Sequence, residues 1–338
     1  MPNEPAESNF KNRITATAYP SEERNGLVWT YMGPRDAAPP LPDIEPTLLP
    51  EGEYWTYAVQ RECNWLQGLE GDIDTVHVGF LHGGHRRLED AVPGSMAYYG
   101  VADRTPRYNV VTTDYGAMYG AYRPAGPGEL YWRIAQFLFP FWVQTPSGML
   151  GHKIHSKAWV PMDDHHTLVF VTSANQRNVD MTTAAPGDPL SPSTLLPNTT
   201  DWFGRFRYSQ TAANDYLIDR ERQRSLQSFT GIPGRSPYSE DQAVTESMGA
   251  ILDRSIEHLG SSDVMVAEVR QLLLAATNAL VEHSEVPASV DSPACYGVRA
   301  GAVILPAALD WLEGIKGLLP AFVEHPELDL SQEFGLSS

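Results

Sequence analysis

Cysteine and positive charge are both scarce in this sequence. Only two of its 338 residues are cysteines, Cys63 and Cys295, and neither belongs to a CxxC or CxH pattern. Two cysteines cannot build a disulfide framework, so we expect both to be buried thiols. Lys and Arg number 24 against 42 Asp and Glu, which gives a net charge of −18. Such a chain repels phosphate backbones, so nucleic acid is not an expected partner.

Long apolar runs are also missing. No segment approaches the roughly 18–20 apolar residues that a membrane helix needs. The first residues, MPNEPAESNFKNR, are polar and lack the apolar core of a signal peptide. We therefore expect a cytoplasmic protein without a membrane partner. With 42% hydrophobic and 10% aromatic residues, the chain can bury the core of one large domain or two modest ones.

The residue patterns predict strands first and mostly helices later. The predicted strands are 26–33, 53–63 and several antiparallel ones between 95 and 175, and the predicted helices are 263–283 and 304–319. A Pro-, Thr- and Ser-rich stretch, 176–200, predicts a long loop or lid. This order favours an α+β domain with one curved antiparallel sheet.

The stretch EGDIDTVHVGFLHGG, residues 70–84, concentrates carboxylates and imidazoles in an otherwise apolar segment. We expect a helix over 64–82, because its residues sort onto two neighbouring faces at 3.6 residues per turn. The apolar face comprises Leu66, Leu69, Ile73, Val76 and Phe80, and the polar face comprises Gln67, Glu70, Asp74 and His77.

Two histidines end this segment. His82 follows His77 by five residues, about 140° further round an ideal helix, so the imidazoles meet only if the helix ends or bulges. Nearby glycines permit such an irregularity. A histidine pair suits iron or zinc, and Asp74 is placed to accept the second ring N–H of His77. The alternative, a solvated helix face with two surface histidines, stays open from spacing alone.

The run N-W-x-Q-x-x-E-G-x-x-D-x-x-H-x-x-x-L-H, residues 64–82, resembles the mononuclear iron motif of Rieske-type ring-hydroxylating oxygenases. The similarity is to the large (alpha) subunits of the phthalate 4,5-dioxygenase-like group. It extends over nearly the whole chain, through 18–34, 159–170, 228–234 and 240–263. The resemblance implies a helix-grip (START/Bet v1-like) catalytic domain with a curved antiparallel sheet and C-terminal helices.

The resemblance also implies the metal ligands. His77, His82 and Asp241 would form a 2-His-1-carboxylate Fe(II) site, and Asp74 would be the carboxylate through which an electron arrives. Asp241 begins a helical pattern whose apolar face includes Val244, so its side chain should point inward. Glu240 is the nearest competitor for the third ligand, and a plain helix N-terminal carboxylate is the other alternative.

Three further polar residues match positions near the iron in this family. They are Asn64, Gln67 and Glu70. We predict that they line the substrate pocket or support the metal ligands. Ordinary polar contacts within the helix are the alternative.

The ligands of a Rieske cluster are absent. A 2Fe-2S Rieske centre needs Cys and His in CxH and CxxH pairs, and this chain has neither. We expect residues 1–50 to be a remnant of the segment that follows a Rieske domain, 51–323 to be the catalytic domain and 324–338 a tail. A truncated chain, a mis-called gene start and a split gene all fit this pattern.

The family's electron supply has a mechanistic consequence. Family members form homotrimers and receive electrons from a reductase through the Rieske cluster of an adjacent subunit. We therefore expect this chain to bind iron and substrate but not to turn over alone.

The resemblance implies an aromatic substrate, and we expect one that bears a carboxylate. It would be dihydroxylated, monooxygenated or O-demethylated with O₂. QFLFPFW, residues 136–142, is predicted as an aromatic pocket wall, with plain core as the alternative. The candidate cations for a carboxylate are Arg104, Arg107, Arg133, Lys153 and Lys157. Two other functions stay open: a non-catalytic aromatic-ligand-binding helix-grip module, and a zinc hydrolase that uses the same metal ligands.

Overall fold

The computed structural model describes residues 3–5, 7–152, 154–174, 195–233 and 237–328. The strands are β1 Ser21–Arg24, β2 Leu27–Thr30, β3 Tyr54–Arg61, β4 Arg107–Thr113, β5 Gly116–Gly126, β6 Glu129–Leu138, β7 Trp142–Gln144, β8 His155–Pro161, β9 Thr167–Ala174 and β10 Gly301–Pro306. The helices are α1 Trp65–Ile73, α2 Met96–Ala102, α3 Arg220–Arg224, α4 Pro237–Ser247, α5 Val264–His283 and α6 Trp311–Ile315. Most of the predicted loop 176–200 lies outside the described residues.

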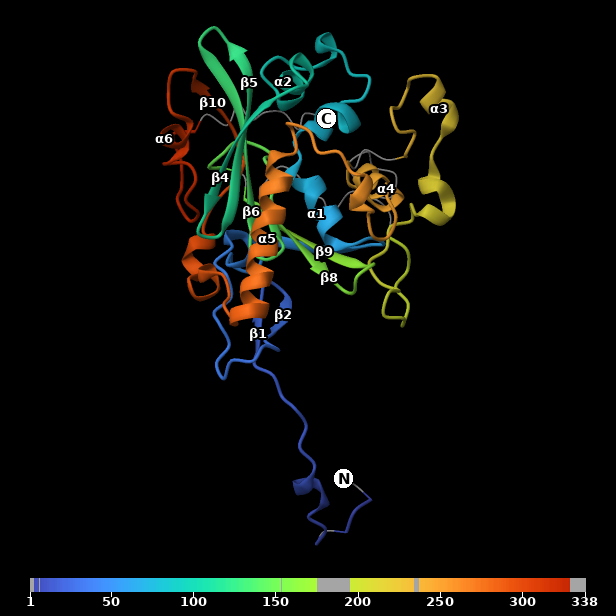
Figure 1. Cartoon of the computed structure of the whole chain (residues 1–338). Coiled ribbons are helices and arrows are strands. Elements are labelled where there is room, and N and C mark those ends of the chain that lie inside the picture. The colour runs from blue at the N-terminus through green and yellow to red at the C-terminus, as the bar shows by residue number, and fades with distance from the viewer. Residues whose placement is uncertain (1–2, 6, 153, 175–194, 234–236, 329–338) are drawn as a thin grey trace.

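One open antiparallel sheet organises the domain. Its strand order is β3-β9-β8-β7-β6-β5-β4, and β10 pairs with the part of β6 that β7 leaves free. Strands β4–β6 run in a different direction from β3, β8 and β9, so the sheet curves around α1 (Figure 1). The predicted α+β class, with a curved antiparallel sheet that grips a helix, is confirmed.

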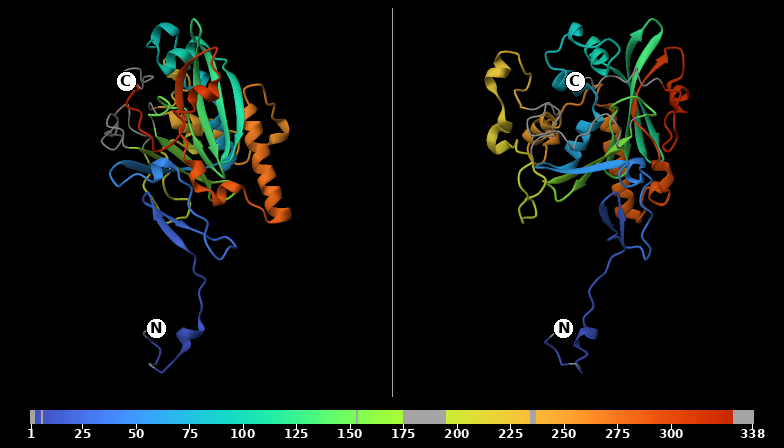
Figure 2. Two further views of the ribbon diagram at one scale, coloured as in Figure 1. Left: turned by 90° about the vertical axis from the view of Figure 1, so that its left-hand side faces the viewer. Right: turned by 180° about the vertical axis from the view of Figure 1, so that it is seen from behind.

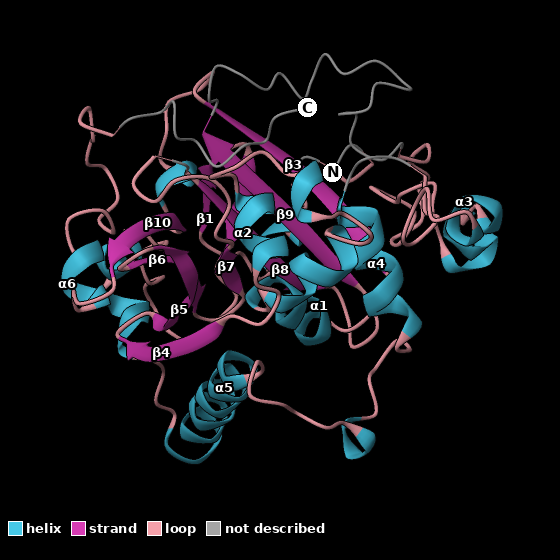
Figure 3. Cartoon of the chain, turned by 90° about the horizontal axis from the view of Figure 1, so that it is seen from above, coloured by secondary structure: helices cyan, strands magenta, loops and turns pink. Residues whose placement is uncertain are grey.

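The two faces of the sheet carry different helices (Figure 3). On the inner face, Leu69 of α1, Tyr119 of β5 and Val269 of α5 belong to one buried apolar cluster. On the outer face, Trp132 of β6 stacks on Trp311 of α6, with 5.3 Å between the ring centroids. The motif-bearing helix α1 is therefore held between the sheet and the long helix α5.

The N-terminal region is joined to this domain by buried polar contacts. Asn25, in the turn of the β1–β2 hairpin, donates to the hydroxyls of Thr56 and Thr172 at 2.7 Å each. Glu45 and Arg299 form a buried ion pair at 2.6 Å. The residues before β1 extend away from the sheet (Figure 2). The division of the chain into three segments stays a prediction.

The predicted helix 304–319 is only partly correct. The structure has β10 followed by the short helix α6 in this region. Val303 and Leu305 pair with Trp132 and Leu130 of β6, so a free sheet edge captured residues whose local pattern favours a helix. The predicted helix 263–283 is confirmed as α5.

Helix α5 also corrects the expectation about apolar runs. It is 20 residues long with a mean hydropathy of 1.4 over its most apolar part, enough by length and composition to cross a membrane. In the fold it packs against β5, β4 and α1. A helix of this kind also occurs in the core of proteins without membrane spans, so the expected cytoplasmic location stays a prediction.

Strand β10 lies close to the backbone of Leu150, and this contact leads to a prediction about stability. A Cβ on Gly301 would lie 2.5 Å from the backbone N and Cα of Leu150. We expect Gly301→Ala to lower the free energy of unfolding by about 1–3 kcal/mol, because overpacking moves backbone. Gly317→Ala is the control, since no atom lies within 4 Å of its Cβ position. Urea denaturation measures both, and equal stability of the two variants would contradict the prediction.

Candidate metal centre

The predicted helix over 64–82 is broken at Asp74. Asn64 caps the N-terminus of α1 by accepting the backbone N–H of Leu66, and the helix ends at Ile73. Asp74 has an extended backbone (φ −92°, ψ 117°). Its carboxylate accepts the backbone N–H groups of Val76 at 2.7 Å and His77 at 3.0 Å. Asp74 thus ends one helix and caps the next turn.

A π-helical turn brings the two histidines together. Residues Val78–His82 form this turn, and Gly83 N–H donates to Val78 O at 2.8 Å, an i→i+5 bond. Residues five apart then lie above one another, and the rings of His77 and His82 are 5.1 Å apart at 78°. The predicted bulge is confirmed. The break has a second effect, because Phe80 leaves the predicted core face and is 46% exposed.

Helix α4 supplies the third ligand candidate. Asp241 Oδ1 lies 2.9 Å from His82 Nε2 and 3.6 Å from His77 Nε2. One ligand atom from each of the three residues falls within 4.8 Å of the others, which is close enough to hold one metal ion. Two imidazoles and one carboxylate are the donor set of the facial triad.

Each imidazole has a second carboxylate behind it. Asp74 Oδ2 lies 3.3 Å from His77 Nδ1, and Glu240 Oε2 lies 2.8 Å from His82 Nδ1. The other oxygen of Glu240 accepts the hydroxyl of Thr230 at 2.7 Å. Glu240, considered from sequence as a competing ligand, therefore lies on the far side of its histidine. Carboxylates in this place fix the ring orientation of metal-ligating histidines.

These carboxylates make the centre strongly anionic. Burial lowers the pKa of His82, but hydrogen bonds and charge from Asp241 and Glu240 raise it to about 9. Burial raises the pKa of Asp241, and His82 and His77 lower it below its usual value. Burial likewise raises the pKa of Asp74, but hydrogen bonds from His77 and the backbone lower it further. An ion of two positive charges suits three carboxylates around two imidazoles.

A cavity of about 330 Å³ adjoins the centre, with Asp74, His77 and Asp241 in its wall. The register of three strands builds the opposite side. Two rows of side chains cross the sheet, Tyr57–Val171–Lys157 and Val59–Val169–Trp159. Tyr238 of α4 also lines the cavity. Each row takes one residue from β3, one from β9 and one from β8. Strand pairing thus brings β3 into the same wall as β8 and β9, which are far from it in sequence.

The predicted aromatic wall 136–142 does not line this cavity. Phe137 is fully buried in the core and Trp142 is 3% exposed in another cluster, so the alternative of plain core is correct. Of the candidate cations, Lys157 lines the cavity. Arg104 instead donates to backbone carbonyls around the π-helical turn. Lys153 lies outside the described residues.

Lys157 belongs to a clasp between the sheet and α1, formed with Asp72 and Trp159. Lys157 Nζ lies 2.5 Å from Asp72 Oδ1, and Trp159 Nε1–H donates to Asp72 Oδ2 at 2.8 Å. The ammonium also lies 4.8 Å from the ring centroid of Tyr238. Sequence analysis did not identify this role of Asp72, although Asp72 lies inside the motif.

Gln67 and Glu70 line the cavity and connect α1 to its neighbours. Gln67 Nε2 donates to the carbonyls of Thr245 and Gly249 at the end of α4. Glu70 accepts from Arg254 and Arg270. Asn64, by contrast, caps the far end of α1 and is not among the residues that line the cavity.

Known proteins with similar sequences include oxygenase subunits. A family model described as "LigXa C-terminal domain like" matches residues 30–317. The 3-chlorobenzoate-3,4-dioxygenase oxygenase subunit of Comamonas testosteroni is 39% identical over 92% of this chain and 73% of that protein. The phthalate 4,5-dioxygenase oxygenase subunit of Pseudomonas putida is 32% identical over 82% of this chain and 62% of that protein.

Among solved structures, dicamba monooxygenase bound to 3,6-dichlorosalicylic acid aligns with 78% of this chain and 71% of its own. The sequence identity is 14% and the TM-score is 0.46. The family model and the 39% identical relative each cover most of the chain. The resemblance noted from the motif is thereby confirmed: this chain belongs to the LigXa C-terminal-like family, the catalytic domains of Rieske-type oxygenase subunits, which are oxidoreductases.

Proposed function

We propose that this chain holds Fe(II) with His77, His82 and Asp241 and oxidises an aromatic, carboxylate-bearing compound by hydroxylation or O-demethylation. The observation that carries the proposal is the convergence of one ligand atom from each residue within 4.8 Å. The family implies non-haem iron, and the residues present fit it. Two imidazoles and one carboxylate are the expected donors, and a carboxylate supports the second nitrogen of each imidazole.

When bound, the iron would supply the site for O₂ activation. The residues around it have separate tasks. Glu240 holds the ring proton on Nδ1 of His82, and the charge of Asp74, 3.3 Å from Nδ1 of His77, favours a proton on that nitrogen. Each Nε2 lone pair is then free for the metal. The apolar rows of the sheet wall exclude water and receive the aromatic ring. Asp74 is partly exposed, and we assign it the entry of electrons through its contact with His77.

Gln67 and Glu70 act in this proposal by fixing α1 against α4 and α5. Their contacts with the end of α4 and with Arg254 and Arg270 support a positioning role. Asn64 contributes by capping α1, the helix that precedes the turn carrying His77 and His82. A direct role for these three residues in the substrate pocket stays a prediction.

The metal centre is tested by measuring bound iron. The purified chain is loaded anaerobically with Fe(II), and iron per chain is determined for the wild type, His77→Ala and Asp241→Ala. We expect about one iron per wild-type chain and clear loss in both variants. Glu240→Gln should keep the site but weaken it by about 10–100-fold, because it loosens the orientation of His82. His165→Ala, on the exposed turn after β8, is the matched control.

Three outcomes would contradict the metal proposal. Iron retention in His77→Ala and Asp241→Ala would show that other residues hold it. A wild type that binds aromatic acids but no iron would favour the ligand-binding module. Preferential Zn(II) binding with ester or amide hydrolysis in air, without reductant, would favour the zinc hydrolase.

Electron supply is the second part of the proposal. The family's oxygenase subunits work with ferredoxin or reductase partners, and the CxH and CxxH pairs of a Rieske cluster are absent from this chain. We propose that electrons reach this domain from a Rieske centre outside residues 1–338, in a homotrimeric assembly. The iron-loaded chain with a reductase and NADH should give no steady product formation. Sustained turnover in that mixture, without any further protein, would refute this part.

A further inference from the structure

Lys157 is a buried cation inside the candidate substrate cavity. It is 5% exposed and lies on β8, in the wall of the cavity that also includes the metal ligand candidate Asp241. An ammonium group has three N–H donors. Among the described residues, its hydrogen-bond acceptor is Asp72, and its other close neighbour is the face of the Tyr238 ring. A donor of this ammonium is therefore left for a molecule in the cavity.

Asp72 fixes the position of this ammonium. Its two oxygens are occupied by Lys157 and by the indole N–H of Trp159, so the carboxylate cannot turn away. The charge of Lys157 also reaches Asp241, whose pKa it helps to lower. The ammonium thus lies near Asp241, in a cavity whose wall combines the apolar and aromatic side chains of the sheet with the carboxylates of α1 and α4.

The two arginines in the wall differ in their partners. Arg270 is paired with Glu70 and Glu257. Arg61 donates to Gln242 and to the backbone of Tyr238, and its Nε is buried without a partner, so Arg61 is the competing cation for a substrate carboxylate. Lys157 differs from Arg61 because it is the nearer of the two to Asp241, whose pKa its charge helps to lower.

We propose that Lys157 binds the carboxylate of the aromatic substrate, and that Asp72 competes with this carboxylate for the ammonium. This inference rests on the proposed function of the cavity and names its specificity-determining residue. An ammonium shared between two carboxylates favours an anionic ligand over a neutral analogue of the same shape. Asp72 holds the ammonium ready and at the same time limits the affinity for the substrate.

Competition between Asp72 and the substrate carboxylate for the ammonium predicts opposite changes in carboxylate affinity for two variants. Removing Lys157 alone would leave Asp72 as an unpaired buried charge, which destabilises folded proteins. The double variant Lys157→Met/Asp72→Asn removes the donor without leaving that charge. Asp72→Asn alone keeps the ammonium, still offers it an amide oxygen as a hydrogen-bond acceptor, and removes the competing negative charge. A merely structural clasp would predict loss of binding in both.

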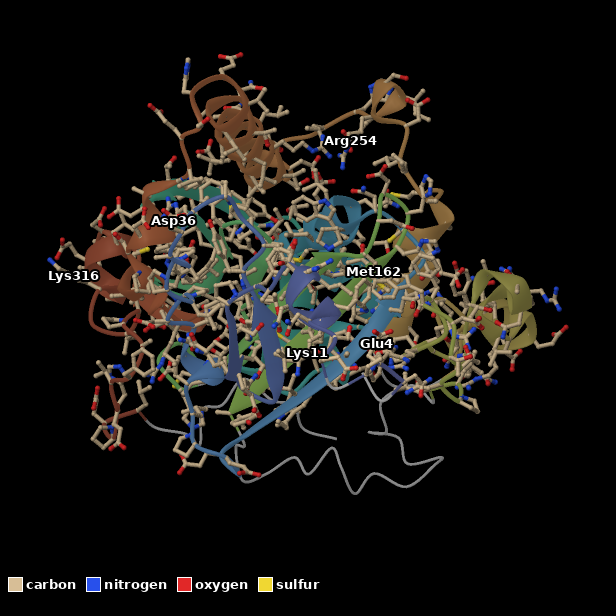
Figure 4. All side chains as sticks on the ribbon, turned by 90° about the horizontal axis from the view of Figure 1, so that it is seen from below. Glu4, Lys11, Asp36, Met162, Arg254 and Lys316 are labelled. Carbon is tan, nitrogen blue, oxygen red and sulfur yellow. The ribbon has the colours of Figure 1, made fainter. Side chains whose placement is uncertain are left out.

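The experiment is an NMR titration of the metal-free 338-residue chain with benzoate and with benzamide, in the presence of a chelator so that no metal holds the carboxylate. We expect the wild type to prefer benzoate at least tenfold. Lys157→Met/Asp72→Asn should lose this preference, and Asp72→Asn should bind benzoate at least as tightly as the wild type. The exposed pair variant Lys316→Met/Glu313→Gln is the matched control, because Lys316 lies at the periphery (Figure 4).

Several results would overturn the assignment. One is a wild type that binds neither ligand, or that binds both equally well. Another is a preference that survives in Lys157→Met/Asp72→Asn. Loss of the preference only in Arg61→Met would assign the carboxylate to Arg61. Competition by inorganic sulfate at the same concentration as benzoate would indicate a general anion site. Iron content is measured separately for each variant, so failure of this inference is distinguishable from failure of the metal centre.

Discussion

The side chain of Asp74 is the constraint on which the rest of the centre depends. By accepting the backbone N–H groups of Val76 and His77, it ends α1 and begins a new turn at the same point. The π-helical turn that follows places His82 beside His77. The same carboxylate lies behind the ring of His77. One residue thus determines the backbone path, the approach of the two imidazoles and the orientation of one of them.

The other two carboxylates of the centre come from helix α4, in a different part of the chain. Glu240 and Asp241 are adjacent on α4, yet they take opposite sides of His82. Gln67 joins α1 to the end of α4 through two backbone carbonyls, which fixes α4, the helix of Asp241, against the segment that leads to His77 and His82. The metal donors therefore depend on helix packing as much as on local sequence.

The cavity shows how sheet pairing and helix packing combine. Antiparallel register aligns Tyr57, Val171 and Lys157 in one row, although β3 is far in sequence from the neighbouring strands β8 and β9. The clasp of Lys157 and Trp159 onto Asp72 then fixes the distance between this wall and α1. Apolar and aromatic side chains with a few placed polar groups are a combination suited to an aromatic acid.

Several features followed from the sequence by itself, for identifiable physical reasons. Alternating apolar and polar residues between turn residues indicated the strands. Apolar residues spaced three and four apart indicated α5. The histidine spacing indicated a bulge, because residues five apart cannot meet on a regular helix. Asp74, His77 and His82 lie close together in the sequence. Their proximity in the structure could therefore be predicted from the local sequence pattern. The order of strands before helices was sufficient for the fold class.

Only the tertiary structure decided the rest. Residues 301–306 became a strand because β6 offered a free edge, which no local pattern contains. Phe80 became exposed because the break at Asp74 rotated the remainder of the segment. The cavity wall is formed by β3, β8 and β9 and not by the predicted residues 136–142. An apolar sequence pattern indicates burial, but it does not indicate whether the buried face lines a cavity or the core. The pairing of Lys157 with Asp72, and of Glu240 with His82, joins residues more than 80 positions apart, and such contacts exist only once the sheet and helices have packed.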